Sequence, residues 1–178
     1  MEQTQQRQPY KMADMFYLDL FRCLHEHRVR YLLVGGLAMN LHGVPRMTMD
    51  VDIVLALDNP NLDAFMACAR KLGLKPQAPV PLESLKDPVK RKEWIETKHM
   101  IAFALNAPQA SGATVDVLIK HPLDMDSAFA AAVTRDVDGV QVLLCGISDM
   151  IALKQNTGRQ QDTADVEHLR RIQSDRQR

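Results

Sequence analysis

The spacing of apolar residues predicts a helix, a buried strand and a second helix at the start of the chain. Between residues 11 and 28, apolar side chains recur every three or four positions, the period of an amphipathic helix. The apolar run at 31–34 ends at Gly35-Gly36, as expected of a buried strand that meets a turn. The glycines then open a short predicted helix at 37–41.

The rest of the chain predicts alternating strands and helices, followed by a helical end. Strands are expected at 51–57, 99–105 and 113–119, and helices at 61–72, 149–156 and 163–173. Residues 135–144 contain Asp138-Gly139, a common two-residue hairpin turn. The stretch 75–92 holds four prolines and a basic cluster, so we expect it to be irregular.

This order of elements places the chain in the α/β (α+β) class, with a mixed sheet flanked by helices. The length of 178 residues suits one ordinary domain with a small appendage. We expect a flexible leader at 1–9, a core at 10–145 and a helical C-terminal extension at 146–178 packed on the core.

Composition narrows the class of protein. Lys and Arg number 22, as do Asp and Glu, so net charge gives no reason to expect a nucleic-acid partner. The three cysteines are far apart, which fits neither a disulfide framework nor a zinc site. No run approaches the roughly 18 apolar residues of a membrane span. The polar N-terminus lacks the apolar segment of a signal peptide, and we expect a cytoplasmic protein with no membrane partner.

The first candidate for chemistry is the pair Asp50 and Asp52, at the start of a predicted core strand. Side chains at positions i and i+2 of a strand point to the same face. Two neighbouring carboxylates repel each other unless a cation lies between them, and their oxygens are the ligands that Mg²⁺ or Mn²⁺ prefers. The alternative for this pair alone is a solvated acidic turn at a strand end.

Two more features strengthen the metal interpretation. Gly35 and Gly36 lie between a strand and a helix, where backbone N–H groups can bind phosphate oxygens, although a plain turn would look the same. Asp116 lies within a β-branched run, and a carboxylate is costly to bury there without a cation or hydrogen bonds. If the strands of Asp52 and Asp116 are neighbours, three carboxylates converge, as two-metal nucleotidyl transfer requires.

These residues resemble the signature of the DNA polymerase β-type nucleotidyltransferase superfamily. In that signature a Gly-Gly pair and a helix precede Asp-x-Asp, and a third Asp follows later. Thirteen residues separate Gly36 from Asp50 here, which agrees with the family pattern. The form Arg46-x-Thr48-x-Asp50-x-Asp52 resembles the AbiEii/AbiGii-type branch, many of whose members are toxins of toxin–antitoxin systems.

The C-terminal end carries a second part of the same resemblance. Residues 149–154, then Gly158-Arg159, Asp162 and Asp165, are similar to a pattern of this branch. The resemblance runs from 31 to 169, and residues 74–100 match no part of the family pattern. It implies that Lys154 contacts nucleotide phosphates. The residues themselves also allow a lysine at the edge of a core stripe and a helix-capping role for Asp162.

The resemblance implies a metal-dependent nucleotidyltransferase that moves a nucleoside monophosphate from an NTP to an acceptor hydroxyl of RNA, protein or a small molecule. Mg²⁺ or Mn²⁺ is the expected cofactor, and an antitoxin is a candidate partner. The expected site comprises three catalytic and metal-binding acids and six nucleotide-binding residues: Asp50, Asp52 and Asp116; Gly35, Gly36, Arg46, Thr48, Lys154 and Asp165.

Two other functions are alternatives to this prediction. A catalytically silent protein of the same fold would serve as a binding or interaction module, but it would have no reason to keep three costly acids and both glycines. A metal-dependent glycosyltransferase also uses Asp-x-Asp, but it usually needs a larger domain than 178 residues allow.

Overall fold

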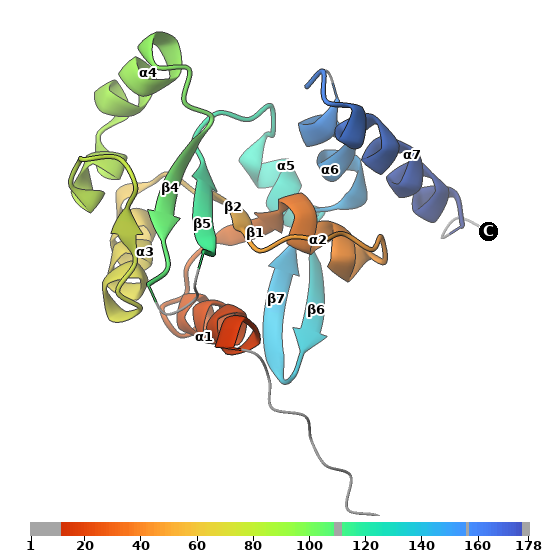
Figure 1. Cartoon of the computed structure of the whole chain (residues 1–178), viewed down its shortest axis with the longest axis horizontal. Coiled ribbons are helices and arrows are strands. Elements are labelled where there is room, and N and C mark those ends of the chain that lie inside the picture. Colours follow the sequence, from red (N-terminus) through yellow and green to blue (C-terminus); the bar gives the residue numbers. More distant parts are fainter. Residues whose placement is uncertain (1–11, 109–111, 156, 176–178) are drawn as a thin grey trace, which may run out of the picture.

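A computed structural model describes residues 12–108, 112–155 and 157–175 (Figure 1). The predicted leader at 1–9 lies outside these residues. In the described part of the chain, seven strands form one mixed sheet in the order β3-β4-β5-β2-β1-β7-β6. The strands are β1 Tyr31–Val34, β2 Val51–Leu55, β3 Lys75–Pro76, β4 Ala102–Asn106, β5 Thr114–Leu118, β6 Val133–Val137 and β7 Val140–Leu144.

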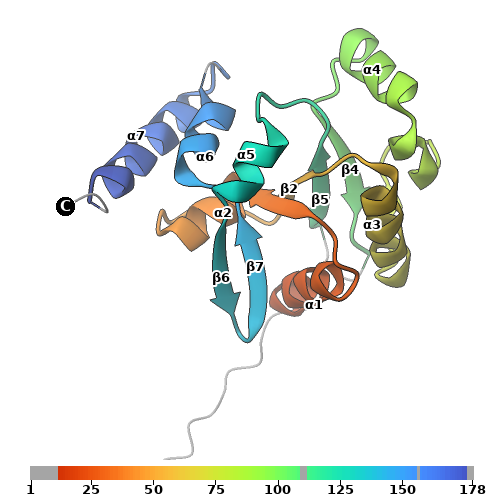
Figure 2. The same cartoon turned by 180° about the vertical axis from the view of Figure 1, so that it is seen from behind.

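The helices of the described residues connect and cover this sheet. They are α1 Met12–Glu26, α2 Gly35–His42, α3 Asn59–Lys71, the 3₁₀-helix η1 Leu82–Lys86, α4 Pro88–Thr97, α5 Met125–Ala130, α6 Ile147–Lys154 and α7 Gln160–Asp175. Helices α1 and α3 contact each other, and α6 packs on α7 near α5 (Figure 2). The α/β class with a mixed sheet is confirmed.

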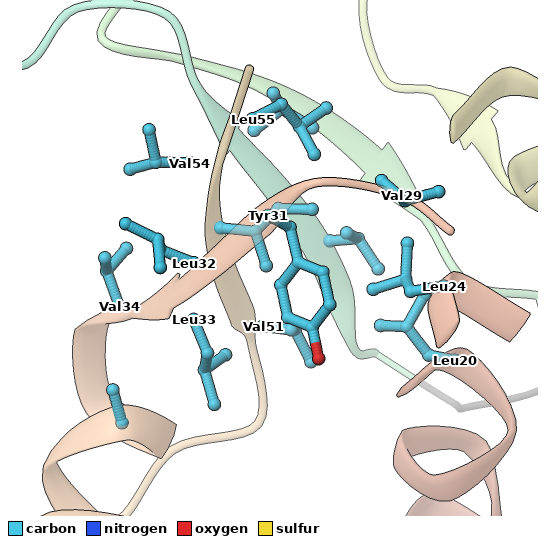
Figure 3. Close-up of a cluster of buried hydrophobic side chains, with 14 of the residues drawn as sticks. Leu20, Leu24, Val29, Tyr31, Leu32, Leu33, Val34, Val51, Val54 and Leu55 are labelled. Carbon is cyan, nitrogen blue, oxygen red and sulfur yellow. The ribbon is translucent and has the colours of Figure 1, made fainter. Parts of the chain in front are cut away.

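The centre of the sheet determines where the polar residues of interest lie. Strand β2 pairs antiparallel with β1 and parallel with β5. The apolar side chains of β1 and β2 are buried on both sides, and Leu20 and Leu24 of α1 lie beside Tyr31 (Figure 3). Burying such side chains stabilises the sheet by roughly 1.5–3 kcal/mol each. The polar ends of these strands are therefore attached to a rigid support.

Local sequence signals account for several element ends. Helix α3 begins after Asp58, whose carboxylate accepts a hydrogen bond from the backbone N–H of Asn61 at 3.0 Å. The predicted hairpin is β6 and β7, joined by Asp138 and Gly139 with φ angles of 50° and 79°. Two positive φ angles are what a tight hairpin turn requires, so the Asp-Gly prediction is confirmed.

The prediction of an irregular segment at 75–92 is wrong. This stretch contains β3, η1 and the start of α4, and Leu85 is fully buried. Pro88 is the first residue of α4, and the Asp87 carboxylate caps the helix by accepting from the N–H of Val89 at 2.9 Å. Proline favours that first helical position, so here it starts a helix and does not prevent one. Trp94 stacks on Phe103 in the core.

The other predicted elements are present with small shifts at their ends. The predicted strand 51–57 ends at Leu55, and the predicted helix 37–41 begins two residues earlier at Gly35. Helix α5, with only six residues, was not predicted. The division into a core at 10–145 and an extension at 146–178 stays a prediction.

Across the described residues, no helix combines the length and the apolar character needed to cross a membrane.

Candidate active site

Two of the predicted acids lie side by side on neighbouring parallel strands. Asp52 of β2 and Asp116 of β5 are directly paired in the register of the sheet. Val51 and Val115, the preceding paired residues, point into the core and are fully buried. Alternation therefore turns Asp52 and Asp116 to the same opposite face, next to each other. Convergence of these carboxylates required the strands of Asp52 and Asp116 to be neighbours, and the sheet confirms that they are.

The third acid, Asp50, lies one residue before β2 and is exposed. Its Oδ1 accepts hydrogen bonds from the backbone N–H of Thr114 at 3.1 Å and from the Thr114 hydroxyl at 2.9 Å. Thr114 therefore ties Asp50 to the start of the strand that carries Asp116. In the described residues, no three His, Cys, Asp or Glu side chains are gathered closely enough to hold a metal ion. The structure thus shows an acid pair with Asp50 at its margin.

The acid pair is electrostatically strained. Burial raises the pKa of Asp52 to about 6, and the negative charges of Asp116 and Asp50 add to the rise. A backbone hydrogen bond from Gly36 and the charge of Lys154 act in the opposite direction. Burial also raises the pKa of Asp116, with Thr114 opposing the shift and Asp50 adding to it. The negative charges of Asp52 and Asp116 are therefore held together without full compensation by hydrogen bonds or nearby positive charge.

The Gly-Gly turn is packed directly against this pair. Gly35 has a φ angle of 67°, and a Cβ on it would lie 2.7 Å from the Cβ of Asp52 and closer still to the carboxylate. A Cβ on Gly36 would lie 2.8 Å from the Cβ of Thr48. Helix α2 begins here, and its N-cap residue, Val34, offers no side-chain cap. The backbone of Gly36 is hydrogen-bonded to Asp52, so the start of α2 meets the acid pair directly.

The loop before Asp50 is fixed by residues that the sequence argument missed. The Asn40 side chain bonds both the N–H and the C=O of Arg46, the latter at 2.9 Å. The Tyr17 hydroxyl donates to the C=O of Met49 at 2.7 Å. Tyr17 is far from the motif in sequence, and Asn40 lies between Gly36 and Arg46, but a helical Asn and a tyrosine carry no signal of such a role. Thr114 was more accessible to prediction, because it precedes Asp116 by two residues on the same strand face.

The remaining predicted site residues form an ion-pair network at the C-terminal helices. Lys154, the last residue of α6, donates to Asp165 at 2.7 Å and to Asp162 at 3.0 Å. Arg46 donates to the other oxygen of Asp165 at 3.1 Å. Asp162 lies within the first turn of α7 and also accepts from the Thr157 hydroxyl at 2.8 Å. Asp162 therefore pairs with a cation, and the capping alternative does not describe its contacts.

The residues present fit a divalent cation. Asp116 Oδ1 is buried and has no hydrogen-bond partner among the described residues. A buried carboxylate oxygen without a partner is costly unless a cation or a ligand proton meets it. Asp52 and Asp116 supply hard oxygen donors, the kind that Mg²⁺ and Mn²⁺ bind. The two paired acids, with Asp50 beside them, are the residues that would hold such an ion.

Comparisons with known proteins bear on the fold. No protein-family model matches the chain, and no curated protein sequence does. Among solved structures, an antigenic nucleotidyltransferase-like protein from Paracoccidioides brasiliensis has a TM-score of 0.55 at 18% identity, covering 92% of this chain and 76% of that one. The chain has the nucleotidyltransferase fold.

Two antibiotic-modifying proteins share this nucleotidyltransferase fold. The lincosamide antibiotic adenylyltransferase LnuA, lincomycin-bound, has a TM-score of 0.54 at 14% identity, covering 91% of this chain and 97% of that one. ANT(2'')-Ia in complex with adenylyl-2''-tobramycin has a TM-score of 0.51 at 10% identity, covering 91% and 94%. At these identities the likeness concerns the nucleotidyltransferase fold alone, and the AbiEii/AbiGii assignment stays a proposal.

The pKa of Asp52 predicts a pH dependence of stability in the metal-free protein. Between pH 3.8 and about 6 the folded state holds a proton that the unfolded state has lost, so the free energy of unfolding falls as pH rises through this window. Asp52→Asn removes this loss. We expect the variant to be more stable than the wild type at pH 7 by about 1–3 kcal/mol, and no more stable below pH 4. Urea unfolding in the presence of a chelator measures the difference. A variant less stable at pH 7 would contradict the electrostatic description.

Proposed function

We propose that this protein is a metal-dependent nucleotidyltransferase that moves a nucleoside monophosphate from an NTP to an acceptor hydroxyl and releases pyrophosphate. The observation that carries the proposal is the pairing of Asp52 with Asp116 directly under the Gly35 turn. This places acids suited to a cation next to backbone N–H groups suited to phosphate.

Each nucleotide-binding residue has a role that its surroundings support. The N–H groups at Gly35 and Gly36 would bind phosphate oxygens, with Gly36 exchanging its hydrogen bond to Asp52 for one to phosphate, and Thr48 borders that turn. Arg46 has a buried Nε that lacks a hydrogen-bond partner among the described residues, and this donor suits a phosphate oxygen. Lys154, a largely buried cation that pairs with Asp162 and Asp165, would counter the charge of a triphosphate. Asp165, the last of the predicted nucleotide-binding residues, pairs with both Arg46 and Lys154.

The chemical step uses the acid pair. Asp50, Asp52 and Asp116 would hold Mg²⁺ or Mn²⁺, whose positive charge would offset the charge that develops on the leaving pyrophosphate. Asp116 accepts the proton of the acceptor hydroxyl, because burial raises its pKa and its Oδ1 has no partner in the described chain. The hydroxyl oxygen bonds to the α-phosphorus, and the bond from that phosphorus to pyrophosphate breaks.

The acceptor is an RNA, a protein or a small molecule. Two structures of the same fold are described with lincomycin and with adenylyl-2''-tobramycin, which makes a small molecule one candidate class. We also propose the finer assignment to the AbiEii/AbiGii-type branch, with a role as the toxin of a toxin–antitoxin system, an antitoxin as partner and a cytoplasmic location. The motif resemblance from 31 to 169 supports this assignment.

Labelled nucleotides test the reaction directly. Each NTP, labelled at the α- or the γ-phosphate, is incubated with the protein, Mg²⁺ or Mn²⁺ and a cell extract. We expect label in an acceptor from an α-labelled NTP and none from the same NTP labelled at the γ-phosphate, and we expect Asp116→Asn to abolish the product. Transfer of the γ-label would indicate a kinase. No labelled product with any NTP would favour the catalytically silent binding module.

A further inference from the structure

Asp165 is the most buried charged residue of the region, with 2% of its surface exposed. It lies on α7, and each of its carboxylate oxygens binds a different cation. Oδ2 accepts from Lys154 Nζ at 2.7 Å, and Oδ1 accepts from Arg46 Nη1 at 3.1 Å. The two cations come from separate parts of the chain, the loop before Asp50 and the end of α6. One carboxylate therefore joins three elements.

Burial of the Asp165 carboxylate costs free energy, and its two cationic partners must be placed accurately to offset that cost. Taking a carboxylate out of water is repaid only when its partners are close and well directed. Both partners of Asp165 are themselves largely buried, with exposed side-chain fractions of 19% for Arg46 and 11% for Lys154. Gln161, one turn earlier on α7, adds a further contact: in the amide orientation that satisfies both groups, its oxygen accepts from the Arg46 guanidinium. Arg46 is thus held from two positions of one helix.

The two cations still have capacity to bind a ligand. The buried Nε of Arg46 has no partner within the described residues. Lys154 Nζ has three N–H donors and uses two of them, on Asp162 and Asp165, among the described residues. Asp165, by contrast, already uses both oxygens, and its charge would repel phosphate. Its position suits holding the cations better than touching a nucleotide.

We propose that Asp165 is a positioning residue that holds Arg46 and Lys154 as a pair of phosphate-binding cations, and that α7 is thereby part of the nucleotide site. This inference rests on the proposed function. It also revises the predicted role of Asp165, because the residue acts on the nucleotide through the two cations and makes no direct contact. The consequence is that a helix more than 100 residues from the Asp-x-Asp motif in sequence determines the affinity for NTP.

Asp162 offers a matched control on the same helix. It binds Lys154 at 3.0 Å but has no ion pair with Arg46. Asp162→Asn and Asp165→Asn therefore remove the same charge from the same helix, and only the second takes an ion-pair partner from both cations.

The test compares binding of NTP with binding of metal. In the full chain, affinity is measured by calorimetry for Mn²⁺ alone and for the NTP that the wild type binds most tightly. We expect Asp165→Asn to weaken NTP binding roughly 10- to 100-fold, the scale of lost charged hydrogen bonds, with Mn²⁺ affinity unchanged. Asp162→Asn should weaken NTP binding roughly 5-fold or less, since Arg46 keeps its partner and Lys154 keeps its shorter bond to Asp165. A general structural role would lower both affinities together.

Combining substitutions tests whether Asp165 acts on NTP binding through Arg46 and Lys154. If Asp165 acts through the cations, Asp165→Asn should cost little more NTP affinity once Arg46→Met and Lys154→Met are both present. An undiminished loss in that background would overturn the proposal. If Asp165→Asn does not fold, Asp165→Glu keeps the charge but moves it, and we expect a folded protein with weakened NTP binding. Wild-type NTP affinity in folded Asp165→Asn or Asp165→Glu would overturn the inference alone, whereas failure of the wild type to bind any NTP would overturn the proposed function.

Discussion

The double variant Asp50→Asn with Asp52→Asn is expected to lose Mn²⁺ binding while staying folded. Asp52 carries an uncompensated charge, and burial and its acidic neighbours raise its pKa to about 6. Asparagine amides keep the shape of the aspartate side chains but carry no charge. We expect the affinity for Mn²⁺ to fall at least about 100-fold, the upper end of the effect of removing a residue that hydrogen-bonds to a metal ligand. The free energy of unfolding should stay equal or rise, because repulsion with Asp116 is relieved.

Calorimetry and urea unfolding measure both parts of this expectation. Asp126→Asn with Asp138→Asn is the matched control, because it removes two exposed carboxylates from α5 and from the β6–β7 turn. The control should leave Mn²⁺ binding unchanged. Unchanged Mn²⁺ affinity in Asp50→Asn with Asp52→Asn would rule out a metal site at these acids.

Gly35→Ala is expected to damage both stability and NTP binding. The φ angle of 67° disfavours any side chain, and the new Cβ would lie 2.7 Å from the Cβ of Asp52. We expect the free energy of unfolding to fall by roughly 2–5 kcal/mol, from the left-handed conformation and from overpacking. Relief of the clash requires Asp52 to move, so NTP affinity should fall even where the protein remains folded.

Gly139→Ala separates the two contributions. Gly139 has a similar φ angle of 79°, but a Cβ on it would have no neighbour within 4 Å. This control should lose only the conformational part, about 1–2 kcal/mol, and keep its affinity for NTP. If Gly35→Ala behaves like Gly139→Ala in both measurements, the glycine turn is merely a turn and does not shape the site.

The central part of the fold could be predicted because its signals are local and strong. Strands β1 and β2 are marked by apolar runs, α2 by the glycine pair with which it begins, and β5 by a β-branched run. The neighbouring position of β2 and β5 was a condition in the sequence argument, and the sheet meets it. The four prolines and the basic cluster of 75–92 predict an irregular segment, whereas Pro88 occupies the first turn of α4, where proline favours a helix.

The site was less predictable than the fold because its support comes from distant residues. Thr114 and Tyr17 act through hydrogen bonds to Asp50 and Met49, partners that only the folded chain brings close. The sequence argument placed Lys154 near the buried face of its helix, but it could not show that Asp165 binds Lys154 and Arg46 at once. These two ion pairs depend on how α7 packs on α6, and no sequence pattern predicts that packing.

Binding of NTP with and without metal tests the central claim most directly. Purified wild-type protein is titrated by calorimetry with ATP, CTP, GTP and UTP, first in a chelator and then with Mn²⁺. The proposed acid pair and glycine turn predict saturable binding of at least one NTP that requires Mn²⁺ and disappears in Asp50→Asn with Asp52→Asn. Absence of binding to all four NTPs in the presence of Mn²⁺, or equal affinity in the chelator, would contradict a nucleotidyltransferase site at these residues.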